Sequence, residues 1–370
     1  MQTLFLTDDS FAALEHQLRC LVANPRIQAV LLMIPAENQY PREDLNALLQ
    51  SLSKPVFGGF FPRVLWNQEQ HEKGCVLLAL SCEVQLTILD EQQLAGSRLE
   101  AALPDISGIE GGHKATLFAF VDGLSSHIGK LMGALFNQYG LELNYIGGGC
   151  GNSTFSPMSC VITPRGVLQG AAVLVMASCH SGIGVAHGWQ SISGAFKVTQ
   201  SDGNRIISLD WRPAFEVYQQ IVEGHSGTCF TEQNYAGLAK SYPFGIAMLG
   251  AEMVIRDPVQ RVDNSLICVG DVRQGAYVHV MHGETSKLIE AARQARERAF
   301  ISFGSEKPNT MIFVNCVSRS MFLGADASRE LTAVQYEGIP LVGALTVGEI
   351  ANSGDDYLEL YNKTSVVGLI

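Results

Sequence analysis

Charged residues are scarce in this chain of 370 residues, at 16% of the total against about a quarter in an average soluble protein. Hydrophobic residues make up 47%, which excludes disorder over most of the length. Lys and Arg together number 25 and Asp and Glu 36, which gives a net charge of −11. A field of that sign repels phosphate backbones and anionic lipid, so we expect no nucleic-acid partner and no membrane partner.

Long apolar runs, a secretion signal and paired cysteines are also lacking. No apolar run reaches the length of about 18 residues that crosses a bilayer. The amino terminus has no basic segment and reaches Asp8 and Asp9 after a few apolar residues, unlike a secretory signal. The nine cysteines are scattered without a C-x-x-C pair, which favours reduced thiols over disulfides or a zinc ribbon. We therefore expect a cytoplasmic protein.

One unit occurs three times in the sequence: an apolar stretch, a helix-forming segment and a glycine-rich apolar stretch. The apolar stretches that open and close the three copies are 29–34 with 55–59, 116–121 with 145–149, and 311–314 with 340–344. This separation is typical of a right-handed βαβ unit, whose two strands are parallel. The strands that follow each copy are joined by short turns and should pair antiparallel: 75–80, 159–163 with 171–176, and 365–369.

The repeat predicts an α/β fold of two domains, with mixed parallel and antiparallel sheets built from a repeated β-α-β-β unit. The length also exceeds what one hydrophobic core usually supports. We place the division within 220–245 and assign residues 1–230 and 231–370 to the two domains. An amphipathic helix is expected near 286–300, with its charged side in solvent.

Signatures of common enzymes are absent: the sequence has no G-x-S-x-G, P-loop, zincin, kinase or EF-hand pattern. His279 and His282, with Glu284 nearby, superficially resemble a metal cluster, but histidines at this spacing usually mark an exposed strand end. We therefore expect no structural metal. The glycines Gly147, Gly148 and Gly149 lack the spacing of a dinucleotide fingerprint, and they indicate either a ligand crevice or close packing of strands.

Several longer segments resemble the FIST domain, a bacterial sensory input module. In the amino-terminal part they are IGGGCGN (146–152), GVAHGW (184–189), KVT (197–199) and GNRIISLDWRPAFEVY (203–218). In the carboxy-terminal part they are YPFGI (242–246), VIRDP (254–258), LICVGDV (266–272), NCVSRSMFLG (315–324) and GIPLVGALTVGEI (338–350). The chain is thus identified as a FIST N-type domain, 1–230, followed by a FIST C-type domain, 231–370.

The resemblance implies a sensory ligand-binding protein of signal transduction. Without an enzyme signature, we expect no enzymatic activity. Amino-acid-like metabolites are among the ligands proposed for the family, and standalone members of about this length resemble haem-bound nitric-oxide sensors that act in trans on a histidine kinase. No output segment follows Ile370, so we expect a separate histidine kinase to receive the signal. Homo-oligomerisation is left open. The alternatives are a metabolite sensor without haem and a cysteine-dependent enzyme that uses Cys150 or Cys316.

Haem needs an apolar slot, an axial ligand and basic groups for its propionates. His187 is the first candidate for the axial and metal-binding position, because Gly188 would let a flat ring approach; the other reading is a core histidine bonded to backbone. His180 and His225 are reserves. Trp189 and Trp211 should pack in the core, with pocket lining as their second role.

Three further residues complete the candidate site. Lys197 and Arg212 are the cations expected to meet propionates or a ligand carboxylate, although Arg212 has Asp210 as an alternative partner. Cys150, beside the three glycines, is either a thiolate ligand or an inert core residue.

Overall fold

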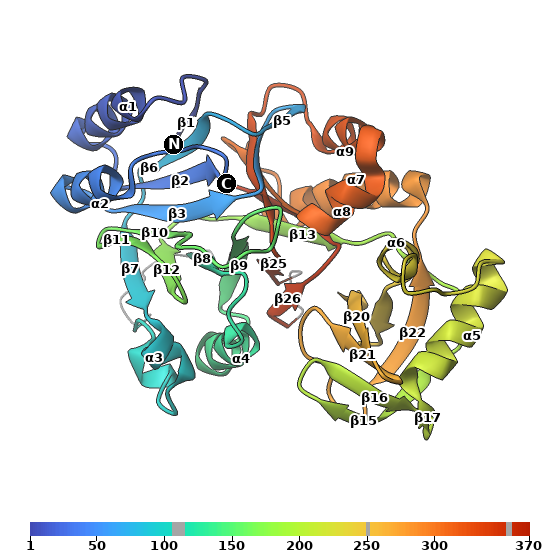
Figure 1. The fold of residues 1–370 in the computed structure, drawn as a ribbon. Coiled ribbons are helices and arrows are strands. Elements are labelled where there is room, and N and C mark those ends of the chain that lie inside the picture. The colour runs from blue at the N-terminus through green and yellow to red at the C-terminus, as the bar shows by residue number, and fades with distance from the viewer. Residues whose placement is uncertain (106–114, 249–251, 353–356) are drawn as a thin grey trace.

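Three six-stranded sheets and one nine-stranded sheet make up the computed structural model (Figure 1), which describes residues 1–105, 115–248, 252–352 and 357–370. The three smaller sheets share one strand order: an edge strand, a return strand, two central strands and a hairpin. The first is β1 (Gln2–Leu6), β6 (Cys75–Leu80), β2 (Ala29–Pro35), β3 (Val56–Phe61), β10 (Val161–Thr163) and β11 (Gly166–Leu168). The second is β7 (Val84–Leu89), β12 (Ala172–Ala177), β8 (Ala115–Asp122), β9 (Leu143–Cys150), β25 (Glu349–Ala351) and β26 (Glu359–Tyr361). The third is β13 (Gly182–Ala186), β27 (Ser365–Leu369), β23 (Met311–Cys316), β24 (Leu341–Thr346), β4 (Arg63–Trp66) and β5 (Glu69–His71).

The predicted repeat is present in all three of these sheets. The central pairs β2–β3, β8–β9 and β23–β24 are parallel. Their crossovers contain α2 (Arg42–Ser51), α4 (Ile128–Tyr139), and α8 (Val317–Leu323) with α9 (Ala327–Val334). The return strands β6, β12 and β27 each pair antiparallel with the first strand of their copy. The α/β fold with mixed sheets built from a β-α-β-β unit is therefore confirmed.

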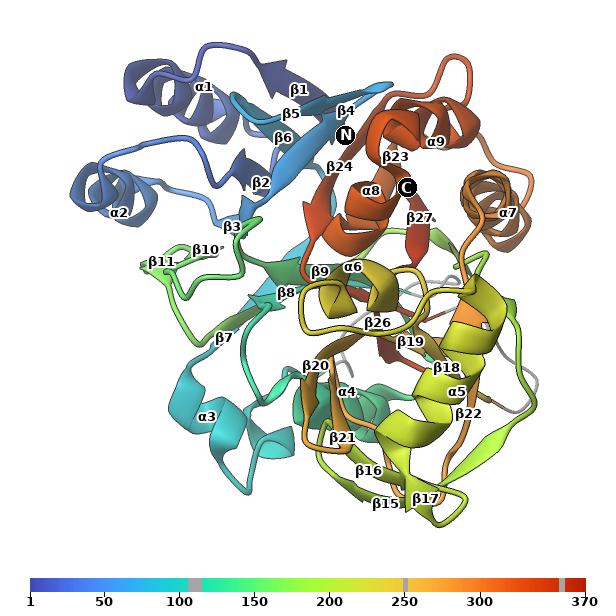
Figure 2. The same ribbon diagram turned by 45° about the vertical axis from the view of Figure 1, so that its right-hand side comes forward.

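Each sheet is completed by strands that follow another copy of the unit. The β4–β5 hairpin follows the first copy and joins β24 of the third. The β10 and β11 strands follow the second copy and join β3, while β25 and β26 follow the third and join β9. The exchange is thus cyclic, and no copy has a complete sheet of its own. The amino terminus, before β1, and the carboxyl terminus, after β27, lie near one another in Figures 1 and 2.

A glycine at the same place in each copy permits close approach of the two central strands. A Cβ added at Gly58, Gly147 or Gly343 would lie 2.2, 1.8 or 1.9 Å from a carbonyl oxygen of the parallel neighbour. No side chain fits at such distances, so these glycines are required by strand packing.

The fourth sheet uses residues 190–282 and lies beside the three-sheet body (Figure 2). Its strands are β14 (Gln190–Ser191), β15 (Phe196–Asp202), β16 (Arg205–Leu209), β17 (Arg212–Pro213), β18 (Phe244–Ile246), β19 (Val254–Arg256), β20 (Pro258–Val262), β21 (Ser265–Cys268) and β22 (Tyr277–His282). The helices α5 (Ala214–Ser226) and α6 (Tyr235–Ala239) accompany them. Trp211 stands at the β16–β17 turn with a left-handed φ of 60° and is 81% exposed, so the expectation of core packing was wrong for this tryptophan.

The remaining helices are α1 (Phe11–Ala23), α3 (Glu91–Ala95) and α7 (Thr285–Phe303), with 3-10 turns at Glu100–Ala102 and Gly324–Asp326. α1 begins where Ser10 accepts a hydrogen bond from the Ala13 amide, and it buries Leu14 and Leu18. α7 covers the predicted 286–300 and packs closely on β13, since a Cβ at Gly184 would lie 1.9 Å from the Ala295 carbonyl oxygen. Within the described ranges, no helix combines the length and apolar character of a membrane span.

The predicted division at residue 230 stays a prediction. β15, β16 and β17 precede it and β18 to β22 follow it, yet all of them join the fourth sheet. The third sheet likewise combines β4, β5 and β13 with β23, β24 and β27. Sheet pairing therefore links segments on both sides of that boundary.

Candidate functional site

A cavity of about 1260 Å³ opens where the first and third sheets meet. Its wall includes Glu37, Pro62 and Val317, which follow the carboxyl ends of β2, β3 and β23. Ligands of α/β proteins bind outside the carboxyl ends of parallel strands, because the loops that leave those ends supply side chains around a shared crevice. The cavity therefore occupies the place where this fold would bind a small molecule.

Charged side chains of both signs line this cavity. Arg63 at the start of β4 forms an ion pair with Glu72, and the Lys73 ammonium lies 2.8 Å from the Asp9 carboxylate. All four side chains are substantially exposed. Exposed pairs contribute little to stability, about 0–1 kcal/mol each. A ligand with a carboxylate and an ammonium group could exchange partners with these pairs at small cost.

The short helix α8 separates the cavity from a buried polar network. Ser320 lines the cavity, and its hydroxyl lies 3.3 Å from the Gln70 side chain on β5. The preceding residue, Arg319, is fully buried. Successive helix residues point in different directions, so α8 presents Ser320 to the cavity and Arg319 to the interior.

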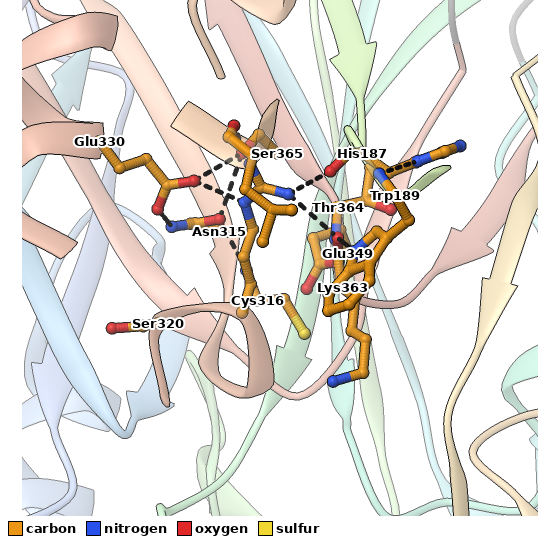
Figure 3. A network of polar contacts seen from close by, with 12 residues as sticks. His187, Trp189, Asn315, Cys316, Ser320, Glu330, Glu349, Lys363, Thr364 and Ser365 are labelled. Carbon is orange, nitrogen blue, oxygen red and sulfur yellow. Dashed lines mark hydrogen bonds and ion pairs between the residues drawn. The ribbon is translucent and has the colours of Figure 1, made fainter. Parts of the chain in front are cut away.

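Figure 3 labels Asn315, Glu330 and Ser365 of this network, and its centre is Arg319. Its guanidinium forms an ion pair with Glu330 of α9, which is also fully buried, and donates to the carbonyl oxygens of His187 and Leu288. The Asn315 amide donates to the second oxygen of Glu330 at 2.7 Å. These bonds connect α7, α8, α9, β23 and the segment after β13. A buried pair with this many partners fixes the relative positions of the elements that supply it.

Lys363 forms a second buried ion pair beside the first. Its ammonium lies 3.1 Å from the Asp257 carboxylate and 5.0 Å from the centre of the Trp189 ring. Burial raises the pKa of Asp257, and the Lys363 charge opposes this shift. The Trp189 indole donates to the Lys363 carbonyl at 3.0 Å (Figure 3). The pair therefore connects the fourth sheet to the three-sheet body.

Glu349, at the start of β25, is a fully buried carboxyl group. Burial raises its pKa to about 8, although the Thr346 hydroxyl at 3.0 Å, the Thr364 amide at 3.2 Å and the Cys316 thiol donate hydrogen bonds to it. Burial and the nearby Glu349 raise the pKa of Cys316 to about 12. A thiol held so firmly protonated is a poor nucleophile.

His187, the predicted axial ligand, borders a smaller cavity of about 390 Å³ together with Trp189 and Glu252. Its Nδ1 accepts the Trp189 amide hydrogen at 2.9 Å, and its Nε2 lies 3.4 Å from the Glu252 carboxylate. Burial lowers the pKa of His187 to about 4, so the ring is neutral near pH 7. Both ring nitrogens thus face protein partners, the arrangement of a core histidine.

Haem fits these residues poorly. An axial ligand needs a ring nitrogen open to a flat apolar slot, whereas Nε2 of His187 faces a carboxylate. Lys197 and Arg212, the predicted propionate partners, do not line the cavity beside His187. Arg212 instead donates to Gln220 at 3.2 Å. The structure therefore brings Trp189 next to His187 but leaves the two cations on β15 and β17.

The reserve histidines are also engaged. His180 Nε2 lies 2.9 Å from the Phe303 carbonyl oxygen, and His225 Nδ1 lies 3.0 Å from the Tyr242 hydroxyl. His279 Nδ1 lies 3.0 Å from the Ser191 hydroxyl. Across the described residues, no group of three or more His, Cys, Asp or Glu side chains is arranged to hold a metal.

The glycine-rich end of β9 is filled by protein. A Cβ at Gly147, Gly148 or Gly149 would lie 1.8, 2.8 or 2.0 Å from a backbone oxygen of β8 or of the loop after β24. Cys150 is fully buried against Gly59, and burial raises its pKa well above the ordinary value. These four residues are brought together, but in packed backbone and not along either cavity described above.

Sequence reasoning missed the residues that line the larger cavity. Arg63, Gln70 and Lys73 lie on or beside the β4–β5 hairpin, and no motif marked that segment. Arg319 lies within the recognised segment 315–324, and Lys363 lies beyond the last one. Charged residues are seldom fully buried, so the sequence did not indicate that either side chain lies in the interior.

The comparisons with known proteins agree with the sequence motifs. The FIST N domain matches residues 28–212 and the FIST C domain matches residues 214–352. No curated protein matches the chain. FIST domains are generally sensory ligand-binding domains of signal transduction. With both domains matched over most of its length, this chain belongs to the FIST family.

Proposed function

We propose that this protein senses a small metabolite with both a carboxylate and an amino group, bound in the 1260 Å³ cavity. The observation that carries the proposal is the pairing of charges there: Arg63 with Glu72 and Lys73 with Asp9. The ligand carboxylate would pair with Arg63 or Lys73 and its ammonium group with the released acid. No bond needs to be made or broken, so the site binds and does not catalyse.

Ligand binding would move the β4–β5 hairpin relative to α8, since Gln70 on the hairpin meets Ser320 on the helix. A displaced hairpin changes the outer surface of the third sheet. We propose that a separate histidine kinase reads this change.

Two alternatives are disfavoured by specific observations. A cysteine-dependent enzyme needs an accessible thiolate, whereas Cys150 and Cys316 are buried with raised pKa values. Haem-based sensing of nitric oxide needs an open axial nitrogen, and His187 lacks one.

The test is calorimetric titration of the purified chain with a panel of amino acids and with their decarboxylated and deaminated analogues. Arg63→Ala and Lys73→Ala should weaken binding of the zwitterions by about tenfold or more, the loss of one charge-assisted bond. Arg19→Ala is the matched control, because Arg19 forms an exposed pair with Glu15 away from the cavity. Equal binding by all three variants, or equal affinity for analogues that lack one charge, would rule the site out.

A further inference from the structure

Two cysteines, Cys82 and Cys179, occupy matching places in the first and second copies of the repeat. Each lies two residues beyond a return strand, Cys82 after β6 and Cys179 after β12. The chain then enters the edge strand of the next sheet, β7 or β13. Both residues therefore lie at crossings between sheets.

The register of β7 and β12 places these two cysteines opposite one another. The last ladder pair is Val84 with Ala177, and the Ser178 amide then donates to the Glu83 carbonyl at 2.9 Å. One step further along this register, Cys82 stands opposite Cys179, where the Cys179 amide turns back and donates to the Ala177 carbonyl at 2.8 Å. Directly opposed residues of antiparallel strands have Cα atoms about 4.5–5.5 Å apart, inside the span of about 4.4–6.8 Å that a disulfide bridges.

The two thiols also interact directly and are accessible. A hydrogen bond from the Cys179 thiol to the Cys82 sulfur lowers the pKa of Cys82 and raises that of Cys179. Both residues are partly exposed, whereas Cys75, Cys150 and Cys160 are buried. Cys82 is the less buried of the two, with a second thiol in contact to resolve an oxidised intermediate.

We propose that Cys82 and Cys179 form a dithiol site that hydroperoxides oxidise to an intramolecular disulfide. The Cys82 thiolate attacks one oxygen of hydrogen peroxide, the O–O bond breaks, and the leaving hydroxide takes a proton to become water. The Cys179 sulfur, as its proton leaves, then attacks the resulting sulfenic acid at Cys82. The S–S bond forms and a second water departs. Two thiols lose two electrons and two protons in total, and one peroxide becomes two waters.

This site is separate from the metabolite cavity, whose lining contains neither cysteine. The disulfide would join the crossing from the first sheet to the second with the crossing from the second to the third. Oxidation of the two cysteines would thus constrain the three-sheet body whether or not the proposed ligand is bound.

The experiment uses the full chain with Cys20→Ser and Cys229→Ser, which removes the two exposed thiols that would form intermolecular bonds. Treatment with hydrogen peroxide should remove two titratable thiols and two mass units, and peptide mapping should link Cys82 to Cys179. In the added Cys179→Ser variant the reaction should stop at sulfenic acid on Cys82, trapped by dimedone. In Cys82→Ser, oxidation should slow by about tenfold or more.

A buried cysteine gives the matched control: Cys75→Ala in the same background should oxidise like its parent, and circular dichroism should show that every variant is folded. Equal oxidation rates in Cys82→Ser and the parent, or a peptide map that links neither cysteine to the other, would overturn the proposal. Neither result depends on whether the cavity binds a metabolite.

Discussion

Replacing Arg319 with Met should destabilise the protein strongly, because the change isolates groups that have no access to water. The Glu330 carboxylate would remain buried without its cation, and the carbonyl oxygens of His187 and Leu288 would lose their donor. Removing one member of a buried ion pair costs about 3–5 kcal/mol, and the unsatisfied carbonyls add to that cost. We therefore expect the free energy of unfolding to fall by at least about 3 kcal/mol.

Urea unfolding followed by tryptophan fluorescence measures this loss. Arg329→Met is the matched control: Arg329 pairs with Asp326 at 2.9 Å in the same region, but its side chain is 65% exposed. Its loss should change stability by no more than about 0.5 kcal/mol. The double variant Arg319→Met with Glu330→Leu should regain much of the stability, since it removes both buried charges. A loss below about 1 kcal/mol in Arg319→Met, or no recovery in the double variant, would refute the reasoning.

Three other predictions follow from buried groups. Burial raises the pKa of Glu349 from 4.5 to about 8, so the folded state binds an extra proton between these values. The free energy of unfolding therefore falls as pH rises through that window, by up to about 1.4 kcal/mol per pH unit. Glu349→Gln should remove this pH dependence from urea titrations at pH 5 and pH 8. Gly147→Ala should lower the melting temperature sharply, because its Cβ would lie 1.8 Å from the Ala119 oxygen, whereas Gly133→Ala, in open space on α4, should leave it unchanged or raise it. Added haem should give wild type no Soret band of a bound haem. His187→Ala should lose about 1–3 kcal/mol of stability without haem, since the Trp189 amide loses its acceptor. A bound-haem Soret band that this substitution abolishes would contradict the reading of His187 as a core histidine.

The sequence was sufficient to predict the three βαβ units because in each an apolar strand, a helical segment and a glycine-containing apolar strand follow one another at near-constant spacing. The exchange of hairpins between copies was not predictable in the same way. β4, β5 and β11 have three or four residues each, too few to show a strand period, and β10 was expected as a strand but not as a partner of β3. Their partners are also distant in the chain, as in the pairing of Trp66 with Val342. Register between such short strands is set by the whole body and not by local pattern.

The site was only partly predictable for a related reason. His187 and Trp189 are indeed neighbours, and His187 is a buried, backbone-bonded histidine, which was one of its two predicted readings. Lys197 and Arg212 failed to join them because cations on exposed strands have no pattern that reports their tertiary partners. Arg319 is buried with Glu330 of the next helix, and Lys363 with Asp257, which lies far away in the sequence. Pairing of this kind becomes visible only in three dimensions.

The strengths of the ion pairs on the two sides of α8 determine which part of the protein a ligand can move. A ligand shifts a conformational equilibrium only by its differential affinity for the two states, which for small metabolites is about 1–3 kcal/mol. That is less than the cost of separating the buried Arg319–Glu330 pair, but it exceeds the worth of an exposed pair such as Arg63–Glu72. The buried network should therefore stay intact in both states and hold α8 in place. β4 itself is held by its ladder with β24, so ligand binding can displace the cavity end of the β4–β5 hairpin, where exposed pairs and the contact of Gln70 with Ser320 hold it.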